Sequence, residues 1–205
     1  MSKIYHEVIF DLETQKFFDE TKTSDPADLG VSVVSLYSRK LDENFIQIEG
    51  QMFSFWEDEL ENMWRYFRGM DRIIGFNSIN FDVPALKRYA PPDFSKLPHF
   101  DIIEHVKSAF GHRVSLNKIA RDTLGDAKTD SGANAVMYWQ KHDSESLAKL
   151  KSYCEADVRI TKDVYDYGLR NGTLKFTDHW NTPREIAVDF SYSQNQASLA
   201  QPSLF

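Results

Sequence analysis

Two carboxylates one residue apart follow an apolar run near the start of the chain, in the stretch VIFDLET from Val8 to Thr14. The run predicts a buried strand, on which Asp11 and Glu13 point to the same face. Two acids on one face repel each other, and Mg²⁺ or Mn²⁺, which prefer oxygen ligands, would relieve that repulsion. Alone, such a pair is more often a solvated strand end, so a metal site requires further residues.

Two more aspartates lie where helices are expected. Asp82, in GFNSINFDVPAL (75–86), stands just before a short helix and either caps it or faces a metal. Asp157 follows Tyr153 by four residues in a long helix, so the two side chains share one face. Asp157 also falls in an apolar stripe, where an unpaired carboxylate would be costly. The alternative for this pair is an ordinary helix with a half-buried tyrosine.

Hydrophobic periodicity predicts the elements that hold these residues. Strands are expected over 4–12, 31–38, 44–50, 72–76 and near 97–103, and helices over 54–69, 84–89, 115–125, 131–142 and 144–172. In the helix over 54–69, Ser54 and Glu57 are expected to form a capping box. This order predicts an α/β domain, a mixed β-sheet flanked by helices, over residues 1–190. A small hairpin is expected within 173–190, and a disordered, flexible tail over 191–205.

Composition limits the class of protein. The 205 residues carry a net charge of −7, which excludes a strongly basic nucleic-acid binder but not an enzyme with metal-neutralised carboxylates. Residues 87–128 are locally basic, with eight Lys and Arg against five Asp and Glu, which fits a phosphate-facing patch or surface scatter. The single cysteine, Cys154, excludes an intrachain disulfide. Without a recognisable signal peptide or membrane-spanning run, a cytoplasmic, reducing location and no membrane association are expected.

The motifs, taken in this order, resemble the DEDD superfamily of 3′–5′ exonucleases, which have a ribonuclease H-like fold. The matching residues are Asp11-Leu12-Glu13, Asn77 to Asp82, and Tyr153-x-x-x-Asp157. The tyrosine is typical of the DEDDy subgroup, which includes ribonuclease D and the proofreading domains of family A and family B DNA polymerases. The second motif is most similar to that of family B. The resemblance spans about residues 5–170 without a polymerase module, so a stand-alone exonuclease is expected.

The resemblance implies two-metal hydrolysis that releases nucleoside 5′-monophosphates from a 3′ end. It implies that Asp11 bridges two Mg²⁺ or Mn²⁺ ions, that Glu13 and Asp157 hold the ion that activates water, that Asp82 holds the other, and that Tyr153 orients the water. The expected substrate is DNA with single-stranded or frayed 3′ ends. The alternatives are an exoribonuclease for RNA processing and a catalytically idle clamp- or nucleic-acid-binding adaptor, although no expected metal ligand is missing.

Substrate contacts follow the motifs less closely. Family members hold the terminal nucleotide with residues close to the first acidic pair. The matching positions here are Thr14 and the main chain of Leu12. Asn77 is expected to bind the sugar–phosphate backbone. Two side-chain groups have open alternatives: Phe17 and Phe18 either stack on a base or anchor their loop, and Lys128 either contacts phosphate or is an ordinary exposed lysine.

The sequence QPSLF, from Gln201 to Phe205, resembles the pentapeptide by which bacterial replication proteins bind the sliding clamp. The matching residues are Gln201, Ser203, Leu204 and Phe205. Leu204 and Phe205 would fill a hydrophobic pocket, and Gln201 would add a directional hydrogen bond. Clamp binding would raise the local concentration of the enzyme at DNA and indicates a role in replication or repair. A chance match on an inert tail is the alternative.

Overall fold

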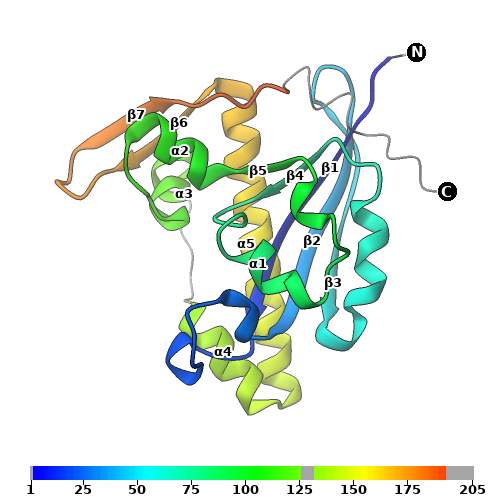
Figure 1. The fold of residues 1–205 in the computed structure, drawn as a ribbon. Coiled ribbons are helices and arrows are strands. Elements are labelled where there is room, and N and C mark those ends of the chain that lie inside the picture. The colour runs from blue at the N-terminus through cyan, green and yellow to red at the C-terminus, as the bar shows by residue number, and fades with distance from the viewer. Residues whose placement is uncertain (1, 126–131, 193–205) are drawn as a thin grey trace.

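The computed structural model describes residues 2–125 and 132–192, which form a five-stranded sheet, a separate hairpin and surrounding helices (Figure 1). The sheet contains β1 (Tyr5–Thr14), β2 (Val31–Leu41), β3 (Gln47–Trp56), β4 (Arg72–Gly75) and β5 (His99–Asp101), and the hairpin contains β6 (Thr173–Thr177) and β7 (Pro183–Ala187). The α-helices are α1 (Asp82–Ala85), α2 (Ile102–Phe110), α3 (Leu116–Leu124), α4 (Gly132–Lys141) and α5 (Ser144–Asn171). Shorter 3₁₀ segments are η1 (Phe18–Glu20), η2 (Pro26–Asp28), η4 (Leu86–Arg88) and η5 (Phe94–Lys96), and η3 (Glu57–Phe67) is a longer one.

The strand order β3-β2-β1-β4-β5 makes the sheet mixed. β1 pairs with β2, and β2 with β3, in antiparallel register, whereas β1, β4 and β5 run parallel. The predicted mixed sheet flanked by helices is therefore confirmed. Because parallel strands end at the same edge of a sheet, the residues that follow β1, β4 and β5 meet there.

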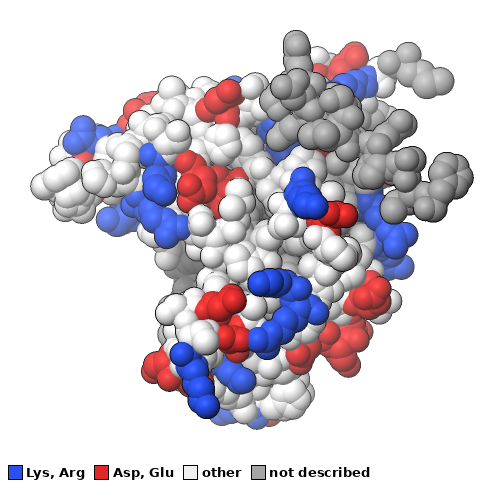
Figure 2. Space-filling model, in the orientation of Figure 1, with Lys and Arg blue, Asp and Glu red and all other residues white. Residues whose placement is uncertain are grey.

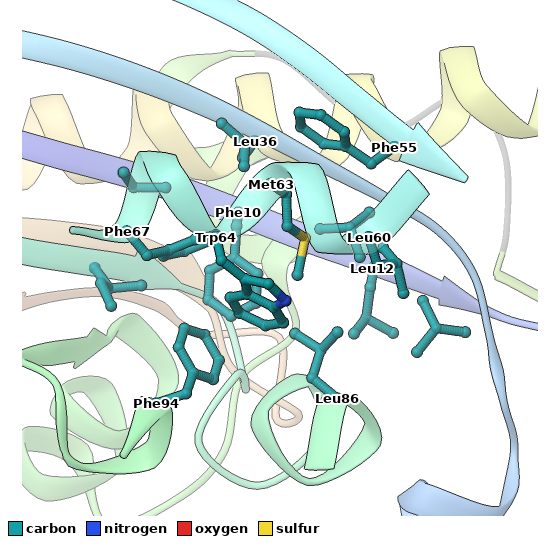
Figure 3. Packing of buried hydrophobic residues seen from close by; sticks show 14 of the residues in the cluster. Phe10, Leu12, Leu36, Phe55, Leu60, Met63, Trp64, Phe67, Leu86 and Phe94 are labelled. Carbon is teal, nitrogen blue, oxygen red and sulfur yellow. The ribbon is translucent and has the colours of Figure 1, made fainter. Parts of the chain in front are cut away.

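Alternation along β1 divides its side chains between the two faces of the sheet. Val8, Phe10 and Leu12 pack in one cluster with the apolar side of η3 (Figure 3). Ile9 belongs to the cluster on the opposite face, which α5 covers with residues such as Val158. Since side chains repeat every two residues, Asp11 and Glu13 share the Ile9 face and point toward α5.

The segment predicted as one helix over 54–69 divides into a strand end and a 3₁₀ helix. β3 continues to Trp56, with the Ser54 and Ser35 hydroxyls 3.0 Å apart across the β2–β3 pair. The predicted capping box of Ser54 and Glu57 is therefore wrong. Glu59 accepts the Trp56 N–H instead, at 3.3 Å. Glu57 accepts hydrogen bonds from the side chains of Gln15 (2.6 Å) and Tyr89 (2.7 Å).

The longest helix, α5, crosses one face of the sheet and packs on β1 and β2 (Figure 1). Its predicted span is confirmed, and Asp143 caps its N-terminus by accepting the Ser146 N–H at 2.8 Å. The hairpin expected within 173–190 is also confirmed, as β6 and β7. Among the helices described, none combines the length and apolar content needed to cross a membrane.

Candidate active site

Three carboxylates converge where β1 meets α5. One oxygen from each of Asp11, Glu13 and Asp157 lies within 4.8 Å of the other two. The strand pleat turns the first two toward α5, and the buried Asp157 meets them from that helix. Three carboxylate oxygens around one point are the donor set that Mg²⁺ and Mn²⁺ prefer. The residues present therefore fit a divalent cation.

Asp82 lies near this group, at the end of the loop after β4, and lines a cavity with it. It is the first residue of α1, it is buried, and its Oδ1 accepts the Leu12 N–H at 3.2 Å. Its carboxylate thus lies against the strand segment that carries the first two acids. Burial raises the pKa of Asp82 to about 7, with Asp101 and Asp157 contributing. A cation beside Asp82 would offset the cost of its buried negative charge.

Tyr153 lies one helical turn before Asp157 and shares its face, as predicted. The two side chains are hydrogen-bonded. Burial, together with the charges of Asp157, Glu13 and Asp11, raises the pKa of Tyr153 above its ordinary value. The phenol therefore keeps its proton at neutral pH and acts as a hydrogen-bond donor.

Two cavities meet at the carboxylates. Both are lined by Asp11, Phe76, Asn77 and Asp157. The first, of about 460 Å³, is completed by Ile103, Arg113, Val114, Ser115 and Leu116. The second, of about 410 Å³, is completed by Leu12, Glu13, Thr14, Lys16, Phe17, Phe18, Leu29, Phe81, Asp82 and Val136. The carboxylates thus lie between two spaces, one of which has several aromatic walls.

The substrate residues predicted from the sequence lie largely at the second cavity. Leu12, Thr14, Phe17, Phe18 and Asn77 all line it. The Phe18 side chain is 46% exposed, and its ring meets Phe81 edge-on at 6.2 Å between centroids. That exposure does not fit a loop anchor buried in the core.

The remaining predicted contacts are not described by the structure. Lys128 and the pentapeptide residues Gln201, Ser203, Leu204 and Phe205 lie outside the described residues. Their roles, and the division at residue 190, stay predictions.

Asp101 is a positioning residue that the sequence analysis missed. It is 1% exposed, and its Oδ1 accepts the N–H groups of Asn77 (2.8 Å) and Ile103 (3.1 Å). Its Oδ2 accepts the Ile79 N–H at 3.0 Å. These bonds hold the loop that leads to Asp82, at a point where Asn77 has a left-handed backbone with φ of 66°. The signal in the sequence was an aspartate between a short strand and a helix, in HFDII.

Arg113 was missed as well. It lines the first cavity, and its guanidinium donates a hydrogen bond to the Asn77 side-chain oxygen. The sequence carried a coarse signal for it, because it is one of the eight basic residues in the segment 87–128. Nothing in that segment distinguished it from its basic neighbours.

We expect Asp101→Asn to loosen the loop between β4 and α1. The amide replaces one accepting oxygen with a donor, which then faces a backbone N–H, so the free energy of unfolding should fall by about 1–3 kcal/mol. Amide hydrogen exchange at Asn77 and Ile79 should accelerate. Asp93→Asn, at an exposed ion pair with Lys96, is the matched control. Unchanged exchange at both amides would contradict this role.

Comparisons with known proteins agree with this fold. A family model described as the RNase_H superfamily matches residues 8–168. Among solved structures, the family B DNA polymerase from the hyperthermophilic archaeon Pyrobaculum calidifontis is similar, with a TM-score of 0.54 and 17% sequence identity. The similarity covers 80% of this chain and 24% of that one, so the chain spans about a quarter of the polymerase. No curated protein sequence matches. Because the family model covers most of the chain, the protein belongs to the RNase_H superfamily.

Proposed function

We propose that the protein is a metal-dependent exonuclease that removes nucleoside 5′-monophosphates from the 3′ ends of DNA. One observation carries the proposal: Asp11, Glu13 and Asp157 converge between two cavities. Membership of the RNase_H superfamily supports a nuclease-type function. The 3′–5′ direction and the DEDDy assignment rest on the sequence motifs, which supply Tyr153 together with the four acids.

The carboxylates of Asp11, Glu13, Asp82 and Asp157 would hold two divalent cations. Bound there, such cations neutralise charge on the phosphodiester and lower the pKa of water to produce a nucleophile. Tyr153 donates its phenolic hydrogen to Asp157, so its hydroxyl oxygen would accept a hydrogen bond from the attacking water and so fix its direction of approach. The protein would thus position the cations and the attacking water and keep Tyr153 protonated, and no protein side chain would act as the nucleophile.

The aromatic second cavity would receive the terminal nucleotide. Phe17, Phe18 and Phe81 offer ring surfaces to an unstacked base, while Thr14 and Asn77 offer polar groups to its sugar and phosphate. A base can enter only after it leaves its own stack, so single-stranded or frayed 3′ ends should be preferred. DNA is proposed over RNA because the structural neighbour is a DNA polymerase and the C-terminal residues resemble a clamp-binding motif.

We also propose that Gln201, Ser203, Leu204 and Phe205 bind a bacterial sliding clamp, which would keep the enzyme at DNA during replication or repair. The support for this partner is the sequence match alone. Tethering would raise the local concentration of DNA ends around an enzyme whose net charge is −7.

The proposed function is tested with 5′-labelled single-stranded, blunt and 3′-recessed DNA and a matched RNA, each with Mg²⁺ or Mn²⁺. We expect a ladder that shortens from the 3′ end of DNA, is weaker on RNA and stops with EDTA. Adding sliding clamp to primed DNA should stimulate the full chain but not a variant without residues 201–205. Cleavage of RNA alone would assign the protein to RNA processing. Absence of cleavage by folded protein with either metal would overturn the nuclease proposal.

A further inference from the structure

The hairpin of β6 and β7 projects from the domain and ends in a rigid turn (Figure 1). The turn over residues 178–182 is built around the buried carboxylate of Asp178. That carboxylate accepts the N–H groups of Trp180 and Thr182, each at 2.9 Å, and the Arg184 Nε–H at 2.8 Å. Three hydrogen bonds to one carboxylate fix the turn and everything that it presents.

The turn presents a tryptophan to solvent. Trp180 is 64% exposed, and one side of its ring lies against His179, with 3.4 Å between centroids. His179 meets His112 edge-on at 6.3 Å, and His112 meets Phe110 at 5.8 Å. A line of rings therefore connects the exposed tip to the body of the domain, where Phe110 packs on the buried Phe176.

One member of this line of rings, His112, is adjacent in sequence to a residue of the first cavity. His112 precedes Arg113, and Arg113 lines the first cavity together with Asp11 and Asp157. Within the part of the chain that the structure describes, Arg113 and Lys118 form no ion pair. The segments 105–125 and 173–187 together carry six Lys and Arg against three Asp and Glu, in a chain with a net charge of −7. Figure 2 shows basic side chains over α2, α3 and the hairpin, with acidic side chains among them.

We propose that the hairpin tip binds the unpaired strand on the 5′ side of the cleaved nucleotide, with Trp180 stacked on a base. This inference rests on the proposed nuclease function, which places the 3′ end at the carboxylates. Exposed aromatic rings and basic groups suit single-stranded nucleic acid, because each base offers a ring face and each phosphate a negative charge. The tip would then add affinity for longer strands without touching the reacting phosphate.

The test measures KM and kcat on oligothymidylates of 2 to about 16 nucleotides, with Mn²⁺, for the full chain and Trp180→Ala. We expect Trp180→Ala to raise KM about ten-fold on the longest strands, in line with the usual contribution of one stacked base, and to leave kcat unchanged. The effect should disappear on the dinucleotide, which occupies only the space around the carboxylates. Trp180→Phe should restore most of the affinity. Ile48→Ala, at an exposed apolar residue of the edge strand β3, is the control and should match wild type.

The outcomes separate this inference from the proposed function. If wild type cleaves every length and Trp180→Ala has the same KM throughout, the tip does not bind the substrate strand and the inference fails alone. If wild type cleaves nothing, the proposed function fails. Fluorescence anisotropy of a labelled 16-mer then decides the inference: ten-fold weaker binding by Trp180→Ala supports the tip as a nucleic-acid surface, and equal binding overturns it.

Discussion

Asp11→Ala should lower the rate of DNA 3′-end hydrolysis by about a thousand-fold or more. Asp11 lies against both cavities, as Asp157 does, and belongs to the carboxylate cluster. Metal binding is worth several kcal/mol of transition-state stabilisation, and each 1.36 kcal/mol is ten-fold in rate. The measurement is single-turnover cleavage of a 5′-labelled strand at saturating Mn²⁺. Residual activity within ten-fold of wild type would contradict the assignment of Asp11.

The same variant should keep its fold, because Asp11 lies in a cluster of like charges. Without a cation, neighbouring carboxylates repel each other, so removing one should leave the free energy of unfolding in EDTA unchanged or higher. Mn²⁺ should stabilise wild type, by about 2.7 kcal/mol at a hundred times its Kd, and should stabilise Asp11→Ala much less. Asp58→Ala, at an exposed acid on η3, is the matched control and should respond to Mn²⁺ as wild type does. Equal Mn²⁺ stabilisation of all three proteins would place the metal elsewhere.

The two pairs of site residues could be predicted because each depends only on the side-chain periodicity of a single strand or helix. Asp11 and Glu13 share a face on any strand, and Tyr153 and Asp157 share one on any helix. Both pairs are present in the structure, and what the sequence did not show is that they lie next to each other. Their proximity requires α5 to cross the face of β1 that carries Ile9, and this depends on the packing of the whole sheet.

The residues missed by the sequence analysis act between elements. Asp101 ends β5 but holds a loop that follows β4, so its role requires the two strands to be parallel neighbours. Arg113 reaches Asn77 from a different segment of the chain. Neither of these contacts produces a periodic pattern in the sequence. The misplaced start of η3 has the same origin: Ser54 is a good cap residue locally, but pairing with Ser35 keeps it in the strand.

The choice between base stacking and loop anchoring for Phe17 and Phe18 is likewise a tertiary matter. A polar loop with two phenylalanines fits both alternatives, since local sequence does not show which surface lies opposite. In the structure, the opposite walls come from Phe81 after β4 and from Val136 in α4. Those walls turn the loop after β1 into one side of a cavity.

Arg72→Met should cause the largest loss of stability among the substitutions considered. Arg72 is 2% exposed in β4, and its Nη1 donates to the Tyr165 hydroxyl (2.9 Å) and the Phe190 carbonyl (2.8 Å). Its Nη2 donates to the Ser191 carbonyl at 2.6 Å, and the guanidinium lies 3.7 Å from the Tyr192 ring centroid. One side chain thus joins the sheet, α5 and the segment after β7.

Methionine fills much of the same volume but donates nothing, so buried acceptors at Phe190 and Tyr165 lose their partner. Each orphaned group costs about 1–3 kcal/mol. We therefore expect the free energy of unfolding to fall by about 4 kcal/mol, measured by urea unfolding followed through tryptophan fluorescence. Arg65→Met, at an exposed arginine, should stay within about 0.5 kcal/mol of wild type.

A milder variant keeps this prediction testable if Arg72→Met does not fold. Arg72→Lys retains the charge but has one ammonium in place of a planar group with two donating arms. It cannot reach Tyr165, Phe190 and Ser191 together, so it should lose about half as much stability and should expose the segment after β7 to proteolysis first. A loss below about 1 kcal/mol for Arg72→Lys, with unchanged proteolysis, would show that Arg72 does not fasten that segment. The attachment of this segment by Arg72 matters for the proposed function, because the segment continues the hairpin whose tip carries Trp180. If the hairpin were released at its base, it could no longer hold the Trp180 ring in one place.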